Sequence, residues 1–331
     1  MNLHEAMQGH MMDAQIDADV SPRYFELKEQ RLGYFVRWCA TQGVTLLEDV
    51  TPNVLRAFIV HLQTVKAYEL NPRRPTEERP LSPTTIKGYM LIVQAFFSWC
   101  EKEGLLDGRL NPTRRVPRVK VPKKIIRTFT ADQMAAMLDA CDQTTALGNR
   151  DYAMLLTFMD TGIRVSELCG LNLDDVHDGY LTVFGKGAKE REVGIGPTAS
   201  RALWKYLHVH RPKLVSSEQE RHVFLGYRGT PMLRNGVNQA LERIGRRAGL
   251  QGVRMSPHTF RHTFARGWLE NGGEIFKLSR VLGHSEMQTT QIYLRDFQSR
   301  EARADHAQFS PVEQLRLGKG KSSKRGDRRH P

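Results

Sequence analysis

Residues 255–294 concentrate side chains that can act on an anionic substrate. This segment contains His258 and Arg261, three residues apart, then His284 directly after a glycine, and finally Tyr293. Arginine and protonated histidine are cationic, neutral histidine accepts protons, and a tyrosine hydroxyl can serve as a nucleophile. These groups together suit an anionic phosphodiester.

The first part of this segment is predicted to be a helix. Ser256-Pro257 pairs a hydroxyl N-cap with a proline at the first helical position, so His258 and Arg261 would share one face near the positive end of the helix, which attracts phosphate. His258 and His262 also form an HxxxH pair. The glutamate of the HExxH zinc motif is missing and Arg261 lies between the histidines, so a metal site is disfavoured and His262 is assigned to the core or to a supporting role.

Two further candidates lie upstream. Arg164 follows Thr161-Gly162 and precedes Glu167 by three residues, and either solvent exposure or pairing with that glutamate would explain it. Lys186 lies between two glycines in a predicted hairpin, which would leave its ammonium group free at the tip. The segment does not match the phosphate-binding GxxxxGK[ST] loop, so nucleotide binding is disfavoured. Taken singly, each candidate also has a structural explanation.

The composition indicates a soluble protein with a polyanionic partner. The chain has 331 residues, and 49 basic against 36 acidic side chains give a net charge of +13. Nucleic acid exploits such an excess, although a basic ribosomal or membrane-surface protein remains an alternative. The four cysteines form no CxxC pair, and the sequence shows neither a secretion signal nor an apolar run long enough to span a membrane. We therefore expect a cytoplasmic protein that binds no membrane.

Residues 21–110 are predicted to form an all-helical domain. Three helices would begin at Ser21-Pro22, Thr51-Pro52 and Ser82-Pro83, each with a hydroxyl N-cap followed by proline. Residues 1–20 are polar and are predicted to be a mobile leader.

Residues 111–127 are predicted to be an extended basic linker. The segment has three prolines and no acidic residue, so it is either a solvated connector or a strap along a phosphate backbone. Its basic residues are Arg114, Arg115, Arg118, Lys120, Lys123, Lys124 and Arg127, and the first six of these are the candidates for DNA contacts.

Residues 128–312 are predicted to form a second, mostly helical domain with one hairpin. A capping box opens it at Thr130, an apolar core helix spans about 150–160, and alternating residues predict strands at 179–184 and 192–195. Helices are expected again at 197–210, 234–248 and 258–270. Residues 313–331 are basic, lack apolar periodicity and are predicted to be disordered.

Four stretches, in this order, carry a resemblance: TGIRVSEL, FGKGAKEREVGI, SPHTFRHTFA and LGHSEMQTTQIYL. Together they resemble the catalytic domain of the tyrosine recombinases, or phage-type integrases, over roughly residues 125–300. The resemblance implies a mainly α protein: an N-terminal helical (SAM-like) core-binding bundle, then a mostly helical catalytic domain with a small antiparallel β-sheet. Only twenty residues precede Ser21, so we expect the two-domain type without an arm-binding domain.

The resemblance also implies a role for each candidate residue. Arg164, Arg261 and His284 would stabilise the phosphodiester, and Glu167 would be the acidic helper of Arg164. Tyr293 would be the nucleophile, His258 its base, and Lys186 the acid for the leaving oxygen.

These roles imply a site-specific DNA recombinase that uses no cofactor or metal. It would form a 3′-phosphotyrosyl intermediate and exchange strands through a Holliday junction, for integration or excision of a mobile element or for dimer resolution. The implied partners are double-stranded recombination sites, three further protomers in a homotetramer, and accessory DNA-bending proteins; the free protein could be a monomer in the cytoplasm, associated with the nucleoid. The alternatives are a type IB topoisomerase-like nicking-closing enzyme and a non-catalytic DNA-binding regulator.

Overall fold

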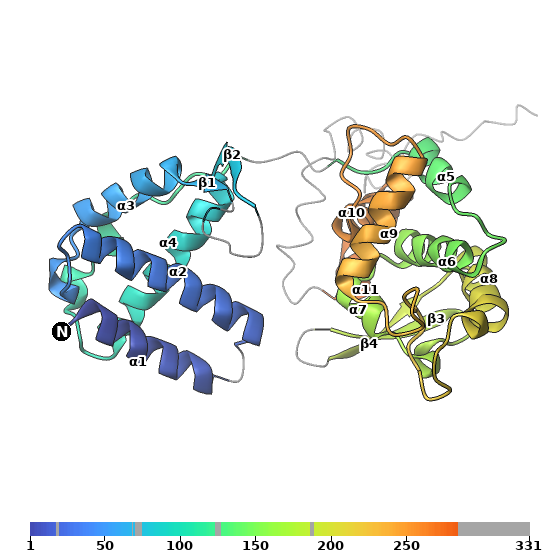
Figure 1. Ribbon diagram of the computed structural model, residues 1–331, viewed down its shortest axis with the longest axis horizontal. Helices are drawn as coiled ribbons and strands as arrows, with labels where there is room; N and C mark the ends of the chain where they lie inside the picture. Colours follow the sequence, from blue (N-terminus) through green and yellow to red (C-terminus); the bar gives the residue numbers. More distant parts are fainter. Residues whose placement is uncertain (18–19, 68, 70–74, 123–126, 186–188, 284–331) are drawn as a thin grey trace, which may run out of the picture. The chain divides into compact units, whose positions relative to one another are not determined.

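The chain divides into two compact units, each with its own hydrophobic core. A computed structural model describes residues 1–17, 20–67, 69, 75–122, 127–185 and 189–283 (Figure 1). The first unit is Met1–Lys124 and the second is Ile125–Pro331. Their cores share no residue, since one cluster ends at Val119 and the other begins at Phe129.

The first unit is a bundle of helices. Its elements are α1 (Leu3–Ile16), α2 (Pro22–Thr41), α3 (Pro52–Thr64) and α4 (Pro83–Lys102), with the short antiparallel strands β1 (Lys66–Ala67) and β2 (Glu77–Pro80) and 3-10 turns at Leu47–Asp49, Gly108–Leu110 and Pro112–Arg115. The predicted starts of α2, α3 and α4 are confirmed, because Ser21, Thr51 and Ser82 each accept a backbone N–H at their helix N-terminus.

Aromatic packing holds the helices of this bundle together. Phe35 of α2, Phe58 of α3 and Phe97 of α4 are fully buried. The rings of Phe35 and Phe58 meet edge to face with centroids 5.0 Å apart. Three helices thus meet through their largest apolar side chains, and this shared burial stabilises the bundle.

The prediction of a mobile leader at residues 1–20 is wrong. Residues 3–16 form α1, in which Leu3 and Ala6 are each 1% exposed and belong to the core of the first unit. The indole Nε1 of Trp99 donates to Asp13 Oδ2 over 2.8 Å. The apolar face of α1 is interrupted by His10, which is itself buried, and alanines supply part of it, so the sequence shows only a weak apolar stripe.

The predicted extended linker at residues 111–127 is partly wrong. Residues 112–115 form a 3-10 turn, and Val116 is buried in the first unit's core. Arg114 Nη2 pairs with Glu101 Oε1 at 2.5 Å, so one basic side chain of the segment is already neutralised within the unit. Arg115, Arg118, Lys120 and Arg127 are exposed, whereas Lys123 and Lys124 lie outside the described residues.

The second unit is mostly helical with one hairpin, so the predicted fold class is confirmed. Its elements are α5 (Ala131–Asp139), α6 (Ala146–Thr161), α7 (Val165–Gly170), β3 (Tyr180–Phe184), β4 (Glu190–Gly194), α8 (Pro197–Lys205), α9 (Arg234–Arg247), α10 (Pro257–Glu270) and α11 (Ile275–Leu282). A π-helical turn, Tyr206–His210, extends α8, and 3-10 turns lie at Leu173–Asp175 and Arg211–Lys213.

The apolar helix α6 lies at the centre of this unit, packed against α8 and α10. Its Phe158 is fully buried and stacks on Phe260 of α10, with centroids 5.8 Å apart. β3 pairs antiparallel with β4, from Tyr180 opposite Gly194 to Phe184 opposite Glu190. The core helix therefore fixes the start of α10, where two candidate site residues lie. None of the helices in the described part of the chain is both long and apolar enough to cross a membrane.

The packing of α1 predicts a stability effect. Leu3→Ala should lower the free energy of unfolding of the first unit by about 2 kcal/mol, because it removes a fully buried side chain and leaves a cavity. Met12→Ala in the same helix should change it by less than about 0.5 kcal/mol, since Met12 is 65% exposed. Hydrogen exchange of the α4 amides reports this unit separately from the other. Equal effects of the two substitutions would contradict the packing of α1.

Candidate active site

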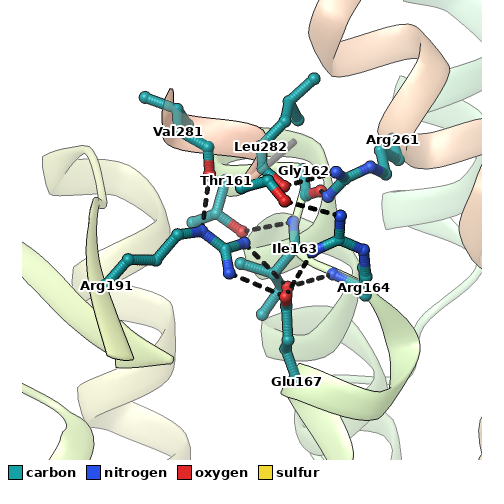
Figure 2. A network of polar contacts seen from close by, with 10 residues as sticks. Thr161, Gly162, Ile163, Arg164, Glu167, Arg191, Arg261, Val281 and Leu282 are labelled. Atoms are coloured by element: carbon teal, nitrogen blue, oxygen red, sulfur yellow. Dashed lines mark hydrogen bonds and ion pairs between the residues drawn. The ribbon is translucent and has the colours of Figure 1, made fainter. Parts of the chain in front are cut away.

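Three arginines from three different elements converge on the end of α11 (Figure 2). They donate to three consecutive carbonyl oxygens: Arg191 Nε to Val281 at 3.0 Å, Arg261 Nη2 to Leu282 at 2.5 Å, and Arg164 Nη2 to Gly283 at 2.9 Å. The last carbonyls of a helix lack intrahelical partners and form the negative end of its dipole. The guanidinium groups satisfy these oxygens and fix the backbone up to the residue that precedes His284.

Glu167 binds two of these arginines through one buried carboxylate. Its side chain is 1% exposed. Arg191 donates to it in a bidentate manner, Nη1 to Oε1 at 2.8 Å and Nη2 to Oε2 at 3.0 Å. Arg164 donates its backbone N–H to Oε2 at 2.7 Å and Nη1 to Oε1 at 2.9 Å. Burial opposes ionisation of Glu167, but the hydrogen bonds from Arg191 and Arg164 outweigh it and hold its pKa below the ordinary value.

A left-handed glycine lets α6, α7 and α10 approach one another at this site. Gly162 ends α6 with φ of +60°, and a Cβ there would lie 2.4 Å from Cδ1 of Phe264. The carbonyl of Gly162 accepts a hydrogen bond from Arg261 Nη1 at 2.8 Å. Two residues later Arg164 occupies the N-cap of α7, from which its backbone reaches Glu167. The turn TGIR thus contains Arg164 and also supplies the Gly162 carbonyl that binds Arg261.

The two candidate arginines differ in exposure. The side chain of Arg164 is 35% exposed, whereas Arg261 as a residue is 6% exposed. Arg261 is held by carbonyls of two separate segments. A ligand phosphate would therefore meet Arg164 at an open surface and Arg261 at the base of the site.

His258 lies on α10 one turn before Arg261 and is exposed to solvent. Partial loss of hydration lowers its pKa, and the positive charges of Arg234, Arg261 and Arg254 lower it further. His258 is therefore mainly neutral at neutral pH and can accept a proton. The pKa of His262 is also lowered, by burial first and then by His258 and Arg261.

Across the described ranges, no three His, Cys, Asp or Glu side chains form a group that could hold a metal ion.

Three predicted site residues, Lys186, His284 and Tyr293, lie outside the described residues. Two described residues flank Lys186 in sequence, and the Gly185 N–H donates to the carbonyl of Lys189 at 2.8 Å. Among the described candidates, the structure brings together Arg164, Glu167 and Arg261. Their catalytic roles stay predictions.

Arg191 was not among the predicted site residues. The second strand was expected at 192–195, but β4 runs from Glu190 to Gly194, so Arg191 lies inside it. Arg191 and the buried Val193 are two residues apart and therefore on the same face of the strand. A charged residue on an inward-facing strand position needs a buried partner. The signal available in the sequence was therefore an arginine two residues before an apolar strand residue.

The buried cluster predicts a pH-dependent stability. Glu167→Gln should lower the free energy of unfolding of the second unit by about 3 kcal/mol at pH 7, because it weakens a buried ionic network. The folded-state pKa of Glu167 lies below its unfolded value, about 4.3. Its contribution is therefore complete above that value and is lost as pH falls through the folded pKa, so the two proteins should converge in acid.

Denaturant unfolding of wild type and variant at several pH values, followed by exchange of the α6 amides, measures this difference. The matched control is Glu270→Gln, which removes an exposed ion pair with Arg266 and should cost less than about 0.5 kcal/mol. A difference between wild type and Glu167→Gln that does not change with pH would contradict the ionised state of this carboxylate.

Comparisons with known proteins place this chain in a family. Residues 127–300 match the profile of the phage integrase family. The chain is 31% identical over 283 residues to tyrosine recombinase XerD of Listeria monocytogenes serotype 4b (strain F2365), covering 84% of this chain and 89% of that protein. It is 35% identical over 251 residues to tyrosine recombinase XerC of Thermodesulfovibrio yellowstonii, covering 74% and 78%.

Solved structures show the same fold. The Tn1549 transposon integrase in complex with transposon right end DNA aligns with a TM-score of 0.69 and 16% identity, covering 93% of this chain and 99% of that one. XerH site-specific recombinase bound to a palindromic difH substrate aligns with a TM-score of 0.68 and 19% identity, covering 87% and 80%. The family profile matches more than half of the chain, and the two relatives are more than 30% identical to it over most of their length. The chain therefore belongs to the phage integrase family and is a tyrosine recombinase.

Proposed function

We propose that this enzyme recombines DNA at specific sites by forming a covalent bond between Tyr293 and a DNA 3′ phosphate. The observation that carries the proposal is the convergence of Arg164 and Arg261 on the end of α11, directly before His284. Two guanidinium groups held at fixed places by protein carbonyls are suited to a phosphodiester, whose transition state gathers negative charge on its non-bridging oxygens.

The proposed acid and base roles follow from the proton transfers that the reaction requires. A tyrosine hydroxyl has a pKa of about 10, so Tyr293 must lose a proton as it attacks phosphorus. His258, neutral because its pKa is lowered, would accept that proton. The deoxyribose 5′ oxygen must gain a proton as it leaves, and Lys186 would supply it. His284 would donate a hydrogen bond to the phosphate beside the two arginines.

This chemistry conserves the energy of the broken bond. The phosphotyrosyl linkage at the 3′ end replaces one phosphodiester, so attack by a 5′ hydroxyl can reseal the strand without a nucleotide cofactor or metal. If the hydroxyl comes from a second duplex, strands are exchanged, and two such exchanges proceed through a Holliday junction. We propose four protomers on two duplexes for this step, with the free protein a monomer and with DNA-bending proteins as accessory factors.

DNA binding is proposed for both domains. We assign residues 21–110 to core binding, with α1 as an added helix of the same bundle, residues 128–312 to catalysis, and residues 313–331 to a basic tail. Arg115, Arg118 and Lys120 are exposed and would contact phosphates, as would Lys123 and Lys124, whereas Arg114 would first have to leave Glu101. Phosphate contacts of this kind make affinity fall with salt.

The biological role proposed here is dimer resolution, with integration or excision of a mobile element as the second candidate. The similarity to recombinases named XerD and XerC supports the first role. The likeness in fold to a transposon integrase and to XerH is compatible with both. Either role places the enzyme on DNA, in the cytoplasm with the nucleoid.

The nucleophile is tested with nicked suicide DNA that carries the enzyme's own site. Wild type should form a covalent protein–DNA adduct at the 3′ end, and Tyr293→Phe should form none, because phenylalanine has no hydroxyl. Tyr227→Phe is the matched control, since Tyr227 is 73% exposed in the same unit and should give wild-type adduct. An equal adduct with Tyr293→Phe would overturn the assignment.

The outcome of cleavage is tested with two sites on one plasmid. A recombinase should give deletion or inversion products that depend on both sites. Relaxation of a supercoiled plasmid without any such product would favour the topoisomerase-like alternative. Site-dependent DNA binding with no covalent adduct would favour the regulator.

The role of His258 is tested by the pH dependence of cleavage. Because its pKa is lowered, the wild-type rate should begin to fall only below about pH 6.5, the ordinary imidazole value. His258→Ala should reduce the rate by about 10²- to 10⁴-fold. Arg254→Gln removes a positive neighbour, so it should raise the pKa and move the acid limb to higher pH. Arg246→Gln, an equal loss of charge on α9, should leave the limb in place; a shift of equal size in both variants would contradict this assignment.

A further inference from the structure

Arg191 lies on β4 and reaches two other elements of the catalytic unit (Figure 2). Its two terminal nitrogens hold both oxygens of Glu167 on α7, at 2.8 and 3.0 Å, and its Nε holds the Val281 carbonyl of α11, at 3.0 Å. The side chain is 15% exposed. Since all three of its nitrogens already donate inside the protein, Arg191 is placed to organise the site and not to bind phosphate itself.

We propose that Arg191 is a positioning residue for DNA cleavage: it fixes Glu167, and through Glu167 the guanidinium group of Arg164, against the end of α11. The inference rests on the proposed function, because Arg164 is the group whose placement matters for the phosphate. Arg164 donates Nη1 to the same Oε1 that accepts from Arg191. One carboxylate oxygen thus sets the relative position of two guanidinium groups.

The contact with α11 gives Arg191 a second point of action. Gly283 ends that helix with φ of +62°, and a Cβ on it would lie 2.9 Å from Cζ and from Nε of Arg191. The guanidinium plane therefore lies directly against the backbone of the residue before His284. Arg164 donates to the carbonyl of this same residue. Loss of Arg191 would loosen both the Glu167–Arg164 pair and the backbone that leads to His284.

The position of Arg191 on β4 ties the hairpin to the same point. Arg191 pairs in register with Val183 of β3, and the next pair toward the turn is Phe184 with Glu190. Lys186 follows Phe184 by two residues in the sequence. Arg191 therefore anchors the strand that begins four residues after the proposed general acid. A single side chain thus joins β4, α7 and the end of α11, the described elements that lie next to Lys186, Arg164 and His284 in sequence.

The test is single-turnover cleavage of the nicked suicide DNA over a range of pH, with DNA affinity measured separately. Arg191→Gln should reduce the plateau rate by about 10²-fold, the effect of displacing a catalytic group by about 1 Å, and should change affinity less than about twofold. It should also make the rate fall more steeply on the acid side of the limb set by His258, because Glu167 loses the hydrogen bonds of Arg191 and its pKa rises.

Two further variants separate positioning from charge. Arg191→Lys keeps the positive charge beside Glu167 but cannot donate in a bidentate manner. Its acid limb should stay near that of wild type while its plateau rate stays reduced. The double variant Arg191→Gln, Glu167→Gln should cleave no more slowly than the slower single variant, because both changes break one unit.

Arg150→Gln is the matched control for a general loss of stability. Arg150 is a buried arginine of the same unit that binds one carboxylate twice, Asp151 at 3.0 and 2.6 Å, and one backbone carbonyl, Leu225 at 2.8 Å. It lies near the N-terminal end of α6, whereas the site lies at the C-terminal end of that helix. Its loss should lower the melting temperature as Arg191→Gln does but leave the plateau rate and the pH profile of the folded fraction unchanged.

The proposal is overturned if Arg191→Gln cleaves at the wild-type rate, if its effect multiplies with that of Glu167→Gln, or if Arg150→Gln reproduces its pH profile. A wild-type enzyme that forms no adduct on its own sites would instead overturn the proposed function, and the inference with it. If Arg191→Gln is too unstable for the assay, Arg191→Lys is used in its place. A reduced plateau rate with an unchanged acid limb would support the positioning role, and a wild-type plateau rate would overturn it.

Discussion

A buried carboxylate shared between two guanidinium groups is the interaction on which the site depends. Glu167 is nearly inaccessible to solvent, and within the described part of the chain it accepts four hydrogen bonds, all from Arg164 and Arg191. Burial of a charged group is costly unless it is paired and fully hydrogen-bonded, and here that condition is met. The carboxylate leaves a net positive charge among its partners, so it orders the arginines without cancelling the charge that an anionic substrate requires.

The arginines are held by main-chain oxygens as well as by Glu167. Their guanidinium groups therefore have fixed positions, unlike the charges of a mobile basic surface. A cluster of lysines on a surface would also attract DNA, but each ammonium group would be free to move with its hydrated stem. Arg261 is fixed by carbonyls at the ends of α6 and α11. Preorganised donors of this kind need little rearrangement when negative charge develops, which is the main requirement of electrostatic catalysis.

Much of the fold was predictable because its signals are local. The pairs Ser21-Pro22, Thr51-Pro52 and Ser82-Pro83 give helix starts that depend on neighbouring residues only, and the apolar sequence of α6 marked a core helix. The α1 helix was missed because its buried face includes His10 and alanines, so its burial depends on distant partners such as Trp99.

The site was predictable only in part, for the same physical reason. Arg164, Glu167, His258 and Arg261 stand in recognisable local motifs, and the structure brings the carboxylate and both arginines together. Arg191 carries no such motif, and its importance comes from contacts with residues 24 and 90 positions away. A charged side chain on the inward face of a strand is a weak signal until its partner is known.

The long-range character of these contacts has a consequence for the synthesis of the protein. Arg164 reaches a carbonyl 119 residues further along the chain, and Arg261 reaches one 99 residues back. Domains fold in the order in which the ribosome releases them, and contacts this distant in sequence form late. The arginines therefore remain unassembled until residue 283 has emerged, and a nascent or truncated chain can hold the folded helical bundle of the first unit before it holds the arginine cluster.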